Sequence, residues 1–268
     1  MVTTDHSTFS QNRKRRFNDS DVFRELFNEI VRVCIEKRLA SGEKVACDGS
    51  FIPANVAWSS RVELDEITEK STYTYLEILD QELQQQPGYQ EGNPIQKKQR
   101  SVRSKTDRDC RYINHGKKKG LGYLLEASVD CQHGIVTGVD VFPGNRKESD
   151  IILQHLERQM SQTGLRIGSL ALDRGYDVGA VHRGLEILGI QGYCAPLQFS
   201  NTPQSMGFSY CESEDCFICP EGATLSYKQI AFRKPTQNYL RFYSCDKDTC
   251  QSCPIAHQCL HGEKSRRI

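Results

Sequence analysis

The chain has 268 residues, a hydrophobic fraction of 37% and a formal net charge of +1, which allows one large domain or two ordinary ones. No apolar run approaches the roughly 18 residues that a membrane helix needs, and the first eleven residues lack the apolar stretch of a signal peptide. These features exclude a helical membrane protein and make the cytoplasm the expected location. The near-neutral charge gives no global argument for a nucleic-acid partner.

The N-terminal region, residues 1–43, is predicted to be helical. Asp19 or Ser20 can cap a helix whose apolar residues recur at helical spacing, and Gly42 is suited to its end. A short strand, residues 44–52, follows at once and carries Asp48 near its C-terminal end.

Residues 61–118 are interpreted as a helical insertion. A helix rich in Glu and Gln is predicted over 61–86 and broken at Pro87 and Gly88, and an exposed connection is predicted over 97–119. Ten basic residues against Asp107 and Asp109 give that connection a net charge of +8. A phosphate backbone is the expected partner, with a solvated linker as the alternative. The ten are Lys97, Lys98, Arg100, Arg103, Lys105, Arg108, Arg111, Lys117, Lys118 and Lys119.

Residues 121–196 read as alternating strands and helices. Strands are expected over 121–130 and 134–142, joined by a short polar turn, and then over 170–173 and 190–196. Helices are expected over 147–162 and 178–188. This order predicts an α/β domain, residues 44–200, with a mixed sheet flanked by helices.

Two strands end in a similar way. Asp48 is followed by Gly49 and Ser50, and Asp173, 125 positions later, is followed by Arg174 and Gly175. Two strand-borne carboxylates of this kind suggest a metal site shared between distant parts of one fold. The alternatives are a strand-end turn residue for Asp48 and an N-cap for Asp173.

Residues 201–268 form a cysteine-rich segment. Seven of the twelve cysteines lie between Cys211 and Cys259, and two Cys-x2-Cys pairs start at Cys216 and Cys250. This spacing suits a tetrahedral Zn²⁺ in a chain without a secretory signal. Free buried thiols are the alternative.

Taken together, the motifs resemble those of DDE transposases of bacterial insertion sequences, which have an RNase H-like fold. The resemblance is carried by Asp48 to Asn55, Ala127 to Gly138, Pro143 to Asn145, Leu172 to Tyr176 and the cysteine-rich segment. It implies an RNase H-like core with an insertion and a small zinc-binding segment.

The resemblance also implies a site and its partners. Asp48 and Asp173 are the positions of the first two catalytic acids, which hold two Mg²⁺ ions for DNA cleavage and strand transfer. The DNA is expected to contact the basic stretch and Arg174, and to comprise terminal inverted repeats and target DNA. The protein is expected to act as a homo-oligomer in the cytoplasm of a bacterium, associated with the nucleoid. Zinc is expected at Cys219, Cys250, Cys253 and Cys259, with Cys216 and Cys245 as rivals and His257 and His261 less favoured.

The third catalytic acid departs from the family pattern. Its glutamate lies on a helix after the cysteine-rich segment, and the chain stops at Ile268, before such a helix. The expectation is a fragment, shortened at the C-terminus and at the N-terminus, that lacks the catalytic glutamate and is inactive. Two other functions stay open, a non-catalytic DNA-binding zinc module and an RNase H-like nuclease.

Overall fold

The chain forms two compact units. In the computed structural model, the described residues are 11, 20–67, 72–90, 98–115, 118–196, 202–233 and 238–268. The first unit comprises Met1–Val62, Val102–Leu172 and Gly189–Tyr193, and the second comprises Glu63–Ser101, Asp173–Leu188 and Cys194–Ile268. The boundaries expected from the sequence, 1–43, 44–200 and 201–268, stay a prediction. No described helix is both long and apolar enough to span a bilayer.

The first unit is built on a mixed sheet with the order β5-β6-β1-β8-β9, in which β7 also pairs with β6. The central strand β1 runs antiparallel to β6 and parallel to β8. The strands are β1 (Lys44–Pro53), β5 (Arg111–His115), β6 (Lys118–Asp130), β7 (Ile135–Pro143), β8 (Ser169–Leu172) and β9 (Gln191–Cys194), whose last residue is counted with the second unit.

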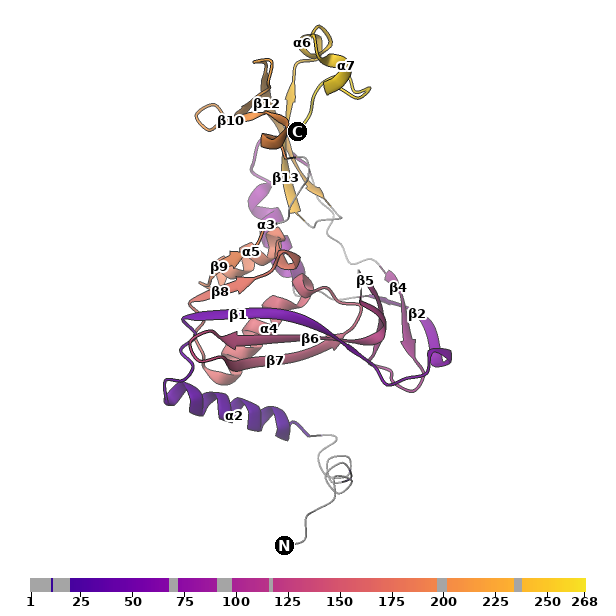
Figure 1. Ribbon diagram of the computed structural model, residues 1–268, viewed down its shortest axis with the longest axis vertical. Helices are drawn as coiled ribbons and strands as arrows, with labels where there is room; N and C mark the ends of the chain where they lie inside the picture. The colour runs from indigo at the N-terminus through magenta and orange to yellow at the C-terminus, as the bar shows by residue number, and fades with distance from the viewer. Residues whose placement is uncertain are drawn as a thin grey trace. The chain divides into compact units, whose positions relative to one another are not determined.

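Two helices pack beside this sheet (Figure 1). Helix α4 (Glu148–Thr163) contacts β6 and β7, and α2 (Val22–Glu36) contacts α4 and β7. Leu124, Phe142 and Ile151 form a buried apolar cluster that joins β6, β7 and α4. The mixed α/β fold predicted from the sequence is therefore confirmed, and so is the helix expected over 147–162. The N-terminal helix is present, but it ends at Glu36 and not near Gly42 as expected.

A buried chain of hydrogen bonds also ties the sheet to α4. Cys47 Sγ lies 3.0 Å from Ser128 Oγ, which lies 2.6 Å from His155 Nε2. His155 Nδ1 lies 2.9 Å from Asp140 Oδ2, and Arg158 donates to Asp140 Oδ1 at 2.6 Å. Ser128 and His155 are fully buried, so this Ser-His-Asp arrangement has no access for a substrate and serves the packing of the sheet.

The insertion contains strands as well as a helix. Residues 61–67 form β2 (Arg61–Ile67), which pairs with β4 (Lys98–Ser104), and the helix α3 (Thr72–Leu83) starts later than predicted. The expectation of one helix over 61–86 and of an exposed connection over 97–119 was wrong. Polar and apolar residues alternate over 61–65, and this pattern favours a strand despite the many acidic residues.

The second unit holds a smaller sheet with the order β10-β11-β12-β13, in which β3 pairs with β12. One buried apolar cluster of this unit consists of Phe208, Leu225, Tyr243, Cys245 and Cys250. Helix α3 contacts α5 in this unit.

The remaining elements of the two units are η1 (Trp58–Ser60), β3 (Tyr89–Gln90), η2 (Arg174–Tyr176), α5 (Gly179–Ile187), η3 (Gln204–Met206), β10 (Ser209–Cys211), β11 (Cys216–Ile218), β12 (Thr224–Arg233), β13 (Asn238–Cys245), α6 (Lys247–Gln251) and α7 (Ala256–Cys259).

Candidate metal centres

Asp48 lies on the central strand of the first unit. Val45, Cys47 and Gly49 are buried, whereas Asp48 and Ser50 are exposed, because successive side chains of a strand point to opposite faces. The Asp48 side chain therefore points away from the face that Cys47 shares with α4. Its Oδ1 accepts a hydrogen bond of 2.8 Å from the Gly49 amide, which fixes one carboxylate oxygen.

Asp173 follows β8 directly and is exposed. It caps the short helix η2, where its Oδ1 accepts a hydrogen bond of 2.7 Å from the Gly175 amide. Tyr176, the last residue of η2, is fully buried and anchors the turn. Asp173 is therefore an N-cap residue, as the alternative interpretation predicted. The cap uses one of the four lone-pair positions of the carboxylate, so three are left for other partners.

Asp48 is counted with the first unit and Asp173 with the second, and both come after the paired part of β1 and β8. The parallel pairing of β1 with β8 matches Lys44 with Ser169 and Ala46 with Ala171. Asp48 is two residues beyond Ala46, and Asp173 is two residues beyond Ala171. Among the core strands β1, β6, β7, β8 and β9, the two aspartates are on the first and immediately after the fourth.

The basic residues expected to contact DNA divide between the two units. In the first unit, Lys105 and Lys119 are exposed and Arg103 is half-buried. In the second unit, Arg174 is exposed, and Arg100 pairs with Glu63, which raises the pKa of Arg100 above its ordinary value. Lys97 and Lys117 lie outside the described residues, as do the side chains of Lys98 and Lys118.

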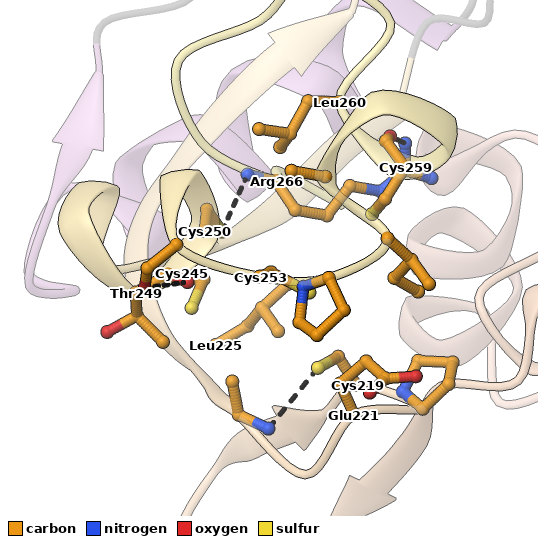
Figure 2. A pocket seen from close by; sticks show the side chains of 16 residues that line it. Cys219, Glu221, Leu225, Cys245, Thr249, Cys250, Cys253, Cys259, Leu260 and Arg266 are labelled. Carbon is orange, nitrogen blue, oxygen red and sulfur yellow. Dashed lines mark hydrogen bonds between the residues drawn. The ribbon is translucent and has the colours of Figure 1, made fainter.

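Five cysteines of the second unit line a cavity of about 270 Å³ (Figure 2). All four cysteines expected to bind zinc line it, together with the rival Cys245. Cys219 follows β11, Cys250 lies on α6, Cys253 follows α6 and Cys259 ends α7. Of the described residues, neither Cys216 nor the histidines at 257 and 261 line this cavity. Cys216 instead lies opposite Cys211 in the pairing of β10 with β11.

Two of these thiols accept hydrogen bonds from backbone amides. The Ala223 amide donates to Cys219 Sγ at 3.2 Å, and the Arg266 amide donates to Cys250 Sγ at 3.3 Å. These bonds hold both sulfur atoms in place beside the cavity. Burial, followed by its bond to Cys250, raises the pKa of Cys245 to about 11, and burial also raises the pKa of Cys259.

One further group of side chains that could bind a metal ion is not indicated by any sequence motif. Asp177, His182 and Cys194 bring one donor atom each within 4.8 Å of one another. Among the residues that the structure describes, this is the one such group of three, and it contains neither candidate catalytic aspartate and none of the four cysteines expected to bind zinc. The rest of α5 and most of the strand β9 separate His182 from Cys194 in sequence, so no local spacing motif indicates the group.

Comparisons with known proteins give only a weak likeness. No protein-family model and no curated protein sequence matches the chain. The Mos1 mariner paired end complex with Mn is similar at 13% identity and a TM-score of 0.27, and the Mos1 transposase paired-end complex with left transposon end at 14% and 0.27. Each match covers 63% of this chain and 40% of the other. The Mos1 Strand Transfer Complex is similar at 11% and 0.28, over 68% and 42%. The chain thus spans about two-fifths of these proteins, and likeness this low assigns neither family nor activity.

Proposed function

We propose that the chain is part of a DDE transposase, in which Asp48 and Asp173 bind Mg²⁺ for DNA cleavage and strand transfer. The observation that supports the proposal is that Asp48 lies on β1 and Asp173 comes directly after β8, the strand that pairs with β1 in parallel. A strand orients Asp48 and a capped turn orients Asp173, and fixed carboxylates suit the spacing that two metal ions require.

The donor set of the two aspartates fits magnesium. Both side chains are exposed, and each has one oxygen held by a backbone amide, from Gly49 or from Gly175. Carboxylate oxygens are the hard ligands that Mg²⁺ prefers, and partial hydration of the ion suits an exposed position. Bound Mg²⁺ would supply activation of the attacking hydroxyl and stabilisation of the leaving oxygen.

The residues of the chain have separate roles in this proposal. Asp48 is oriented by the central strand, and Asp173 is oriented by its bond to the η2 turn. Arg174 is next to Asp173 and exposed, so it is suited to bind the phosphate that reacts. Lys105 and Lys119 would add phosphate contacts elsewhere along the DNA. The third acid stays unassigned, and so do the oligomeric state and the sequences of the repeats.

A structural zinc ion in the second unit completes the proposal. Cys219, Cys250, Cys253 and Cys259 would bind it, and the two amide bonds to thiols support this choice. An ion bound to four thiolates would add stability to the segment besides that of its buried apolar cluster. Closed tetrahedral coordination makes this ion structural.

Iron-mediated backbone cleavage tests the aspartate site without requiring catalysis. Fe²⁺ in place of Mg²⁺, with ascorbate and peroxide, is expected to cut the chain near residues 48 and 173, and excess Mg²⁺ should suppress both cuts. Asp48→Asn and Asp173→Asn should each remove both Mg²⁺-sensitive cuts, because the ions are shared, whereas the exposed Asp65→Asn control keeps them.

The same experiment separates the alternatives. A chain that binds DNA in a gel-shift assay but shows no Mg²⁺-sensitive cut near residue 48 would refute the metal site and favour a non-catalytic DNA-binding module. Cuts at both positions, combined with preferential Mg²⁺-dependent hydrolysis of RNA-DNA hybrids, would favour an RNase H-like nuclease.

A further inference from the structure

Three side chains of different chemistry meet in the second unit, apart from the cysteine-lined cavity. Asp177 follows η2 directly, His182 lies on α5 and Cys194 is the last residue of β9. His182 Nε2 lies 2.9 Å from Asp177 Oδ1. The Cys194 thiol donates to the Asp173 carbonyl at 3.2 Å. The donor oxygen, nitrogen and sulfur all lie within 4.8 Å of one another.

This spacing is close to that of a bound metal ion. With metal bonds of about 2.0 Å to nitrogen and oxygen and about 2.3 Å to sulfur, donors of a tetrahedral site are roughly 3.3 to 3.6 Å apart. The nitrogen and oxygen of His182 and Asp177 are already slightly closer than this. The sulfur of Cys194 therefore needs to move by little more than about 1 Å, which a rotation of its side chain provides.

We propose that Asp177, His182 and Cys194 bind one divalent cation of the zinc class. A donor set of thiolate, imidazole and carboxylate selects Zn²⁺ or Co²⁺ over Mg²⁺, because sulfur is a poor ligand for hard cations. Burial, followed by the charges of Asp177 and Asp173, raises the pKa of Cys194 to about 11, so the cation must displace the thiol proton. The His182 side chain is 48% exposed, which leaves the fourth position to water, as in open metal sites.

The ion would hold together the segment that begins at Asp173. Asp173 caps η2, Asp177 follows η2 and His182 lies on the next helix, so one ion would join both helices to Cys194. On binding, Cys194 loses its proton to solvent and its hydrogen bond to the Asp173 carbonyl. If this cation also orients Asp173 for catalysis, that effect rests on the proposed function. The binding of the cation itself does not.

Cobalt binding to the whole reduced chain tests the site. Co²⁺ is titrated into the wild type and into Cys194→Ser, after one equivalent of Zn²⁺ has been added to occupy the four-cysteine site. The wild type should take up one Co²⁺ per chain with a thiolate-to-cobalt charge-transfer band, which added Zn²⁺ abolishes. Cys194→Ser should lose this band, and His182→Gln and Asp177→Asn should each weaken Co²⁺ binding at least tenfold. The control Cys131→Ser, which removes an exposed thiol, should resemble the wild type.

A second measurement follows the thiol itself. Zn²⁺ should slow the alkylation of Cys194 by N-ethylmaleimide at least tenfold, as localised by tandem mass spectrometry, and should not protect Cys131. A Co²⁺ spectrum that is unchanged by Cys194→Ser would overturn the proposal. Equal protection of Cys194 in the wild type and in folded His182→Gln would do so as well. Neither outcome depends on DNA cleavage, so the failure of this site and the failure of the proposed function are distinguishable.

Discussion

Replacement of Asp140 by asparagine is expected to destabilise the first unit. Asp140 is 3% exposed and accepts hydrogen bonds from Arg24 at 3.0 Å and Arg158 at 2.6 Å, and its other oxygen faces His155 at 2.9 Å. Burial raises the pKa of Asp140, but the bonds from His155, Arg158 and Arg24 outweigh burial and bring it to about 2. Asp140→Asn keeps the shape of the side chain and removes its charge.

The magnitude follows from this pKa. A carboxyl whose pKa falls from 3.8 to about 2 on folding stabilises the folded state by about 2.4 kcal/mol at neutral pH, at about 1.4 kcal/mol per unit. The side chains of Arg24 and Arg158 are 40% and 33% exposed, so solvent screening reduces this to about 1–2 kcal/mol. Because the folded pKa is the lower one, this stability is present above the unfolded pKa and is lost as the pH falls toward 2.

Urea unfolding followed by tryptophan fluorescence measures this effect, since the single tryptophan, Trp58, lies in the first unit. Near pH 7, Asp140→Asn should lower the free energy of unfolding by about 2–3 kcal/mol, which includes the weakened bond to His155. At pH 3, about half of the charge-dependent part should remain. The exposed Asp65→Asn control should change stability by less than about 0.5 kcal/mol. A loss for Asp140→Asn that stays constant from pH 7 to pH 3 would refute the electrostatic explanation.

Two other changes test the packing and the zinc site. A Cβ at Gly122 would lie 2.3 Å from the Ile52 carbonyl oxygen, so Gly122→Ala should cost about 2 kcal/mol in the tryptophan assay, whereas Gly168→Ala, with 3.2 Å to its nearest atom, should cost less than about 1 kcal/mol; equal losses would contradict this reasoning. Elemental analysis of Cys250→Ser should show one zinc fewer per chain than the wild type, and Cys131→Ser should retain the wild-type content; a folded wild type without zinc would contradict the four-cysteine site.

Periodic patterns predicted the elements whose burial is one-sided. Helix α4 and the strands β6 and β7 lie close to their expected bounds, because each buries one face in the first unit. The many Glu residues of the segment 61–67 favour a helix, whereas its alternation of polar and apolar residues favours the strand that forms. The basic stretch was predicted as an exposed connection, yet Ser101, Ser104, Cys110 and Ile113 are buried in and between its strands. Charge content alone does not show which side chains of a strand face inward.

Contacts between distant residues could not be predicted in this way. Ser128, His155 and Asp140 form one network, but neither their order nor their spacing in the chain resembles a known motif. The same holds for His182 and Cys194, which only the arrangement of η2, α5 and β9 brings together. The roles of Asp48 and Asp173 stay a prediction, because they follow from a resemblance between motifs.

The position of β1 at the centre of the first sheet has a consequence for folding. The hairpin of β6 and β7 forms from neighbouring residues, whereas β1 must find partners that start at Lys118 and Ser169. Such non-local pairing slows folding, so the hairpin with α4 is the expected early structure and β1 the late one. Loop-closure entropy grows slowly with length, by about 0.6 kcal/mol per doubling. The number of residues between Pro53 and Lys118 therefore adds little to the entropic cost of bringing β1 to its partner β6.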